Sequence, residues 1–157
     1  MSLTNEEKEI VQLAGWFHDT GYITKCFGHE EESKTLAKIF LLKNQFPLEK
    51  IVRVMECIDA TKIPKYTNDS LDEILCDADF THLSTKNYLN RLQELRKEWS
   101  LILKINYSDS KWWEMNLAFL ENHQYFTQYG KEVLEKGKQK NLVLIKKRMP
   151  QNEQNKL

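Results

Sequence analysis

The sequence has little glycine and proline, and its cysteines form no paired pattern. Five glycines and three prolines in 157 residues are few for a β protein, which needs frequent turns. Cys26, Cys57 and Cys76 are far apart and form no CxxC pair, so neither a zinc knuckle nor a disulfide framework is indicated. Cys57 and Cys76 have apolar neighbours, which predicts buried thiols in a reducing compartment.

The chain also lacks a long apolar run and an excess of charge of either sign. No run approaches the roughly 20 apolar residues that span a bilayer, and no apolar segment marks the N-terminus as a signal peptide. Lysine and arginine together number 23, as do aspartate and glutamate, so no global basic field favours nucleic acid. We therefore expect a cytoplasmic protein that binds neither membranes nor nucleic acids.

What the sequence does contain is helical periodicity over most of its length. Apolar residues recur at spacings of three and four, and we find neither an internal repeat nor an alternating strand pattern of useful length. This pattern predicts an all-α domain of six or seven helices over residues 1–149. The domain would comprise a motif-bearing half (6–84) and a helical C-terminal half (85–149), followed by a disordered tail (150–157).

Local signals place the first helices. Thr4 and Glu7 have the spacing of a capping box, and Gly21 is predicted to end the helix that follows. A second helix is predicted from about residue 29 to 43, and Ser70 is predicted to cap a later one. The apolar stripe predicted for the second helix consists of Leu36, Ile39, Phe40 and Leu42.

Three polar clusters fall at predicted helix ends or inside apolar stretches. His18 and Asp19 lie in AGWFHDTGY, His29 begins a helix in GHEEES, and Asp77 and Asp79 lie in EILCDADF. A carboxylate inside an apolar helix is costly to bury unless it is paired or bound to a metal. Imidazole together with carboxylate suits Mn, Fe, Ni or Zn rather than Mg alone.

Each cluster alone has an ordinary structural explanation. A His-Asp pair is often a helix-end histidine beside a solvated aspartate, and His29 alone would be an exposed residue at a helix start. Asp77 alone would be the partner of a lysine or an amide. The order of the motifs is more specific than any one of them: HD-x-G-Y, then HE-x-x-S, then I-x-A-T-K, then L-x-DAD.

This series resembles the HD superfamily of metal-dependent phosphohydrolases over about residues 6–84, and its last motif is similar to that of small bacterial HD proteins. The resemblance implies a divalent metal ion, which could be Mn, Fe, Ni, Co, Zn or Mg. His29 would be a second-metal ligand or a phosphate contact. The metal ligands that the resemblance implies are His18, Asp19, His29, Asp77 and Asp79, the last two with equal weight.

The activity that the resemblance implies is hydrolysis of a phosphate ester, either a nucleotide or another small phosphorylated substrate. Asp19 or the carboxylate of the DAD motif, for which we name Asp79, would orient the attacking water or take its proton. The candidate substrate contacts are Lys62, Thr61 and Glu30. Lys62 and Thr61 have an equally simple alternative as solvated loop residues.

One feature departs from the family pattern. In the family a further metal-binding histidine lies on a helix upstream of the HD pair, but none of the 17 residues before His18 is a histidine. We expect that helix to be missing from this sequence. The departure keeps open a degenerate HD domain that binds a nucleotide or a protein partner without catalysis. An accidental His-Asp pair in a helical interaction module is a third alternative, and homodimerisation is also left open.

The C-terminal half carries less specific signals. Trp99, Trp112 and Trp113 are predicted to be core residues. Residues 122–141 mix aromatic and basic side chains. They could form a basic, aromatic-lined mouth for a nucleotide, or an amphipathic helix pair with a solvated basic face.

Overall fold

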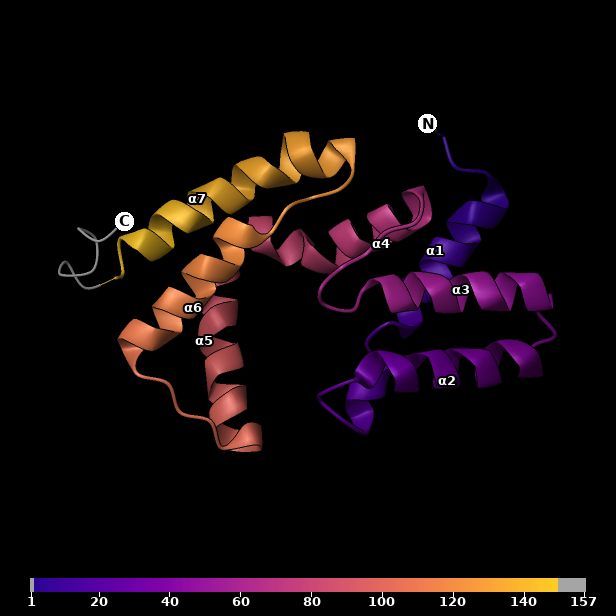
Figure 1. The fold of residues 1–157 in the computed structure, drawn as a ribbon, viewed down its shortest axis with the longest axis horizontal. Helices are drawn as coiled ribbons and strands as arrows, with labels where there is room; N and C mark the ends of the chain where they lie inside the picture. Colours follow the sequence, from indigo (N-terminus) through magenta and orange to yellow (C-terminus); the bar gives the residue numbers. More distant parts are fainter. Residues whose placement is uncertain (1, 150–157) are drawn as a thin grey trace. The chain divides into compact units, whose positions relative to one another are not determined.

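A computed structural model describes residues 2–149, and within that range the chain is helical and contains no strand (Figure 1). The prediction of an all-α fold is confirmed, whereas the predicted tail at 150–157 lies outside the described residues. The chain divides into two compact units, the first ending at Asp79 and the second beginning at Phe80. No helix in the described range is long and apolar enough to cross a membrane.

The first unit contains four α-helices and one short 3-10 helix, and the second contains three α-helices with shorter helical turns. The elements of the first unit are α1 (Asn5–Phe17), η1 (Thr20–Ile23), α2 (His29–Lys43), α3 (Leu48–Ala60) and α4 (Ser70–Asp79). Those of the second are η2 (Phe80–Ser84), α5 (Tyr88–Glu98), η3 (Trp99–Leu103), α6 (Asp109–Asn122), η4 (Gly130–Leu134) and α7 (Glu135–Lys146).

The predicted capping box begins α1. The Thr4 hydroxyl accepts a hydrogen bond from the Glu7 N–H at 3.2 Å, and the Glu7 carboxylate accepts one from the Thr4 N–H at 2.7 Å. The helix ends at Phe17, and the His18 N–H still donates to the Ala14 carbonyl at 2.9 Å. The HD pair therefore begins at the C-cap of α1.

The cap of α4 differs from the prediction. The carboxylate of Asp69, not the hydroxyl of Ser70, accepts hydrogen bonds from the N–H groups of Leu71 at 2.9 Å and Asp72 at 3.3 Å. The same carboxylate pairs with Arg53 of α3 at 2.6 Å. An aspartate can thus cap α4 and anchor it to α3 together, which a serine hydroxyl cannot do.

The predicted apolar stripe of α2 is also wrong. The side chains of this helix that are buried belong to Ser33, Ala37 and Leu41, whereas Ile39 and Phe40 are 61% and 48% exposed. Buried residues at spacings of four form an unbroken stripe, and its two small members let α2 approach its neighbours closely. The other members of the predicted stripe are Leu36, which is half-buried, and Leu42, which is exposed.

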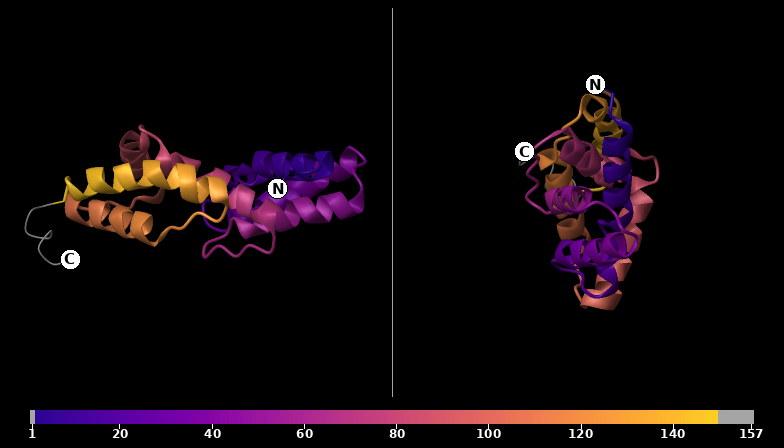
Figure 2. Two further views of the ribbon diagram at one scale, coloured as in Figure 1. Left: turned by 90° about the horizontal axis from the view of Figure 1, so that it is seen from above. Right: turned by 90° about the vertical axis from the view of Figure 1, so that its right-hand side faces the viewer.

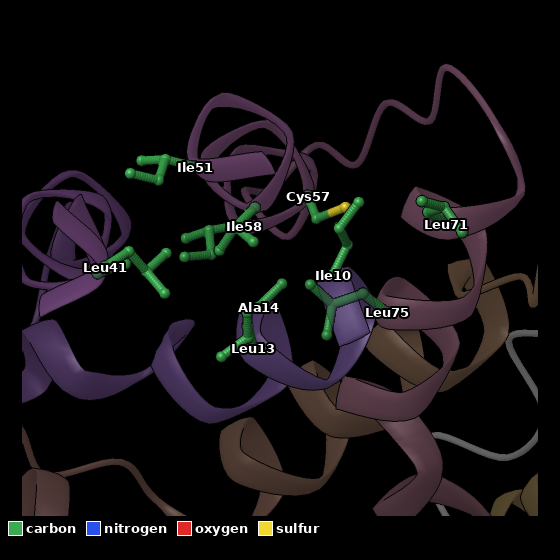
Figure 3. Close-up of a cluster of buried hydrophobic side chains, with 11 residues drawn as sticks. Ile10, Leu13, Ala14, Leu41, Ile51, Cys57, Ile58, Leu71 and Leu75 are labelled. Carbon is green, nitrogen blue, oxygen red and sulfur yellow. The ribbon is translucent and has the colours of Figure 1, made fainter. Parts of the chain in front are cut away.

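The core of the first unit lies where its four α-helices meet. Leu13 and Ala14 of α1, Leu41 of α2, Ile58 of α3 and Leu75 of α4 point toward one another in Figure 3 and are buried. This packing holds α1, α2 and α4 against one another, and the polar motifs lie at the C-terminal ends of α1 and α4 and at the start of α2.

Cys57 and Cys76 are buried, as predicted. Burial raises the pKa of Cys57 to about 12 and that of Cys76 to about 11, so both thiols are protonated at neutral pH. The Cys76 thiol donates to the carbonyl of Ala60 at 3.1 Å. Both cysteines are therefore packing residues.

The second unit has a core of its own, and α6 packs along α7 within it (Figure 2). Trp112 and Trp113 are buried, and Trp99 packs edge-on against Trp112 with ring centroids 5.6 Å apart, as expected for core residues. In the stretch that mixes aromatic and basic residues, Lys138 is only 3% exposed and donates to the His123 carbonyl at 2.6 Å. This lysine is therefore not part of a solvated basic face.

Candidate functional site

Gly21 and Ser33 bring the first two motifs together. The Gly21 N–H donates to the Ser33 hydroxyl at 2.8 Å, and both residues are buried. A Cβ atom on Gly21 would lie only 2.0 Å from the carbonyl oxygen of His29. Glycine is thus required for the close approach of η1 to the first turn of α2. The prediction that Gly21 ends α1 is wrong, because the residue lies inside η1.

The polar side chains of the three motifs meet beside this contact. The Nε2 atom of His18 lies 3.3 Å from Asp19 Oδ2 and 3.7 Å from Asp79 Oδ1. The Nε2 atom of His29 lies 3.4 Å from Asp19 Oδ1 and 3.7 Å from Glu30 Oε1. We call His18, Asp19, His29 and Asp79 the His–Asp cluster, and Glu30 lies at its edge.

The contacts of His18 favour a positive charge in the cluster. His18 Nδ1 lies 2.9 Å from the Gly15 carbonyl, which can only accept, so Nδ1 carries a proton. In a neutral ring, Nε2 would then present its lone pair to the carboxylates of Asp19 and Asp79. Burial opposes a charged imidazole, but hydrogen bonds to these two carboxylates outweigh it and raise the pKa of His18 to about 10. A proton or a metal cation at Nε2 would relieve the repulsion.

Asp79 is held from its other side by a lysine that the sequence analysis did not select. Lys65 Nζ donates to Asp79 Oδ2 at 2.8 Å and to the Cys76 carbonyl at 3.3 Å. Burial would raise the pKa of Asp79, but hydrogen bonding to His18 and the charge of Lys65 lower it below its ordinary value. Lys65 lies in the loop between α3 and α4, where its sequence context is that of a solvated lysine.

Tyr22 is the second residue that sequence reasoning did not select, although the HD-x-G-Y motif contains it. Its ring stacks on His29 with centroids 3.7 Å apart and an interplanar angle of 21°. Burial, followed by the charges of three nearby carboxylates, raises the pKa of Tyr22 to about 12. The phenol is therefore neutral at physiological pH and holds the His29 ring in place.

The two aspartates of the DAD motif have different surroundings. Asp79 contacts His18 and is a member of the His–Asp cluster, while Asp77 is 4% exposed within α4. The structure thus places Asp79 beside His18.

The candidate substrate contacts are dispersed. Glu30 lies beside His29, whereas the buried Thr61 hydroxyl donates to the Ile58 carbonyl at 2.7 Å in the last turn of α3. Lys62 contacts the carboxylates of Glu31 and Asp59. Of these three candidates, Glu30 is the one that lies beside a member of the His–Asp cluster, His29.

Lys62 belongs to a closed set of ion pairs that joins α2 to the end of α3. Lys34 Nζ lies 2.9 Å from Glu31 and 2.6 Å from Asp59, the same two carboxylates that Lys62 contacts. We call Glu31, Lys34, Asp59 and Lys62 the ion-pair ring. A phosphate that bound Lys62 would have to compete with two carboxylates.

A surface hollow of about 570 Å³ lies on this side of the first unit. Lys34 and Lys62 line it together with apolar side chains of α3 and the following loop, among them Val52, Met55 and Ile63. No member of the His–Asp cluster is among its lining residues. The hollow and the cluster are therefore separate features.

The donor set of the His–Asp cluster suits a metal in its chemistry, because two imidazoles and two carboxylates are ligands for first-row transition ions. In the described part of the chain, however, no three His, Cys, Asp or Glu residues form a ready metal-binding group. The side chains of the cluster are arranged as ion pairs. Metal binding would therefore require these side chains to exchange their ion pairs for contacts with the metal.

Comparisons of the chain with protein-family models, with curated proteins and with solved structures find no match. The resemblance to the HD superfamily therefore rests on the series of motifs in the sequence alone.

Proposed function

We propose that this protein is a metal-dependent phosphohydrolase that acts on a nucleotide or another small phosphate ester. The observation that supports this most is that His18, Asp19, His29 and Asp79 meet although they come from separate helix ends. Nδ1 of His18 is bound to a backbone carbonyl, so Nε2 is the atom that would bind a cation, in exchange for its proton. Ligand histidines commonly have their second nitrogen fixed in this way.

His18, Asp19 and Asp79 would hold the metal, with His29 at its edge. When bound, a divalent cation supplies charge to the phosphate oxygens and lowers the pKa of water. Asp19 is the most exposed carboxylate of the cluster, at 56% of its side chain, and is placed to accept a proton from solvent or substrate. The Gly15 carbonyl orients His18 through its contact with Nδ1.

A second candidate function is a nucleotide-binding or protein-interaction module without catalysis. One observation favours it: the described residues contain no ready metal-binding group. In this alternative, protonated His18 and Lys65 would supply the charge that balances the carboxylates.

The compartment that we propose is the cytoplasm, because two of the three cysteines are buried as thiols. The partner that we propose is a small phosphorylated molecule rather than nucleic acid, since the chain has no net charge. Whether two copies associate is a matter for measurement of the mass in solution.

The test is metal analysis of the purified chain, followed by a hydrolysis screen of nucleotides and aryl phosphates with Mn²⁺, Ni²⁺ or Co²⁺. His18→Ala and Asp19→Ala should lose both metal and activity. Glu9→Ala, which removes an exposed carboxylate of α1 that pairs with Lys50, is the matched control and should retain both. A parent chain that holds no metal and cleaves no ester would overturn the proposal. Nucleotide binding by such a chain would support the second candidate.

A further inference from the structure

The loop between α3 and α4 directs two lysines to different places. Lys62 enters the ion-pair ring, whereas Lys65 reaches the His–Asp cluster. The Lys65 side chain is 9% exposed, against 37% for Lys62. An ammonium group that is so little exposed needs partners inside the protein, and Asp79 and the Cys76 carbonyl supply them.

Lys65 restricts the orientation of the Asp79 carboxylate. Oδ2 accepts the hydrogen bond from Lys65, and Oδ1 faces His18. A carboxylate with one oxygen held by a charged donor cannot rotate freely, so the other oxygen keeps a fixed direction. That direction is toward the imidazole nitrogen at which the proposed metal would bind.

We infer that Lys65 is a positioning residue for the metal site, an inference that rests on the proposed function. It fixes Asp79 so that Oδ1 is presented toward His18 and Asp19. The sequence motif had named Lys62 as a candidate substrate contact. In the structure it is Lys65, not Lys62, that contacts a member of the His–Asp cluster.

The charge of Lys65 has an opposing effect, because an ammonium repels a divalent cation. The geometry favours the positioning effect, since the negative carboxylate of Asp79 lies between Lys65 and His18 and offsets the ammonium charge. Loss of an outer partner of a metal ligand typically lowers metal affinity about 10- to 100-fold. We expect the removal of Lys65 to have an effect of that size and direction.

The experiment measures Mn²⁺ affinity by calorimetric titration of the full chain without substrate. Lys65→Met should weaken binding about 10- to 100-fold, and Lys65→Arg, which retains charge and donors, should restore it to within a few-fold of the parent. Lys62→Met is the matched control from the same loop and should bind as the parent does. Circular dichroism checks that each variant is folded. Lys65→Gln, which removes the charge and shortens the side chain, replaces Lys65→Met if that variant does not fold.

Unchanged or tighter Mn²⁺ binding by Lys65→Met or its replacement would overturn the inference, as would an equal loss in Lys62→Met. In either case the parent would still bind Mn²⁺, and the proposed metal site would stand. A parent chain that binds no Mn²⁺ would overturn both the metal site and the role of Lys65.

Discussion

The Gly21 N–H donates to the Ser33 hydroxyl at 2.8 Å, across a contact that leaves no room for a side chain at residue 21. A Cβ atom there would meet three backbone atoms of α2: the His29 carbonyl oxygen at 2.0 Å, the His29 carbonyl carbon at 2.8 Å and the Ser33 nitrogen at 2.9 Å. Because these are backbone atoms of a helix, they cannot move aside as a flexible side chain can. The contact therefore controls the spacing between Asp19 and His29.

Gly21→Ala should destabilise the first unit by about 1–3 kcal/mol, because the added methyl group forces η1 away from α2. Gly15→Ala is the control, since a Cβ there lies 3.8 Å from Leu75 Cδ1, an ordinary contact. Because Gly15 lies in the interior of α1, its replacement by alanine should raise the free energy of unfolding by about 0.5–1 kcal/mol. Urea unfolding measures both. Equal effects of the two substitutions would show that the close approach is not the cause.

Local chemistry made some elements predictable from the sequence. The capping box at Thr4 and the start of α2 at His29 depend on residues within one helical turn, and both were predicted correctly. The buried face of α2 was not, because Ser33 becomes buried only through its bond to Gly21. Gly21 itself was ambiguous, since a glycine can end a helix or permit a close approach, and only the tertiary structure distinguishes the two.

The same limit applies to the candidate site. Motif order suggested that His18, Asp19 and His29 belong together, and the structure brings them together. Motif order could not choose between Asp77 and Asp79. These two residues lie two positions apart in the motif but point about 200° apart around a helix, and only the structure shows which one faces His18. Lys65 has no motif, and its contact with Asp79 depends on the path of a loop that the sequence pattern does not determine.

Asp72 should be among the most important polar residues for stability. Its side chain is fully buried, and its carboxylate accepts hydrogen bonds from Arg53 at 2.9 Å and from the Asn68 N–H at 3.0 Å. Asp72→Ala should lower the free energy of unfolding by about 3 kcal/mol, because it leaves both donors without this partner. Thermal and urea unfolding measure the loss.

Glu56→Ala is the matched control for Asp72→Ala. Glu56 pairs with the same Arg53 at 3.4 Å, but its side chain is 56% exposed. Solvent screens such a pair, so its removal should cost less than about 1 kcal/mol. A cost for Glu56→Ala as large as that for Asp72→Ala would contradict the role assigned to burial.

The ion-pair ring should make stability depend on pH in the acid range. Hydrogen bonds from Lys62 and Lys34 lower the pKa of Glu31 from its ordinary value of 4.5. Burial opposes the charge of Asp59, but the same two lysines lower its pKa from 3.8. A carboxylate with a lowered folded-state pKa stabilises the fold above its unfolded-state pKa, and this stabilisation is lost as pH falls through the folded-state value. The contribution should be full above about pH 5 and decline below about pH 4.

A Lys34→Met/Lys62→Met double variant tests this pH dependence. Its free energy of unfolding should fall below that of the parent at pH 7, by no more than about 1 kcal/mol for each exposed pair. The gap between the two proteins should narrow as the pH falls toward 3 and the carboxylates take up protons, and at high salt, which screens the ion pairs. A gap of the same size at pH 3 and pH 7 would rule out the ring as its source.

Asp79→Asn and Asp77→Asn separate the two aspartates of the DAD motif. Both changes are nearly isosteric and lie in the same helix, but it is Asp79 whose Oδ1 lies 3.7 Å from His18 Nε2. Asp79→Asn should lower Mn²⁺ affinity by at least about tenfold, because an amide is a neutral and weaker ligand than a carboxylate. Asp77→Asn should retain the affinity of the parent to within a few-fold. Calorimetric titration measures both, and a greater loss in Asp77→Asn would place the functional carboxylate at Asp77 instead.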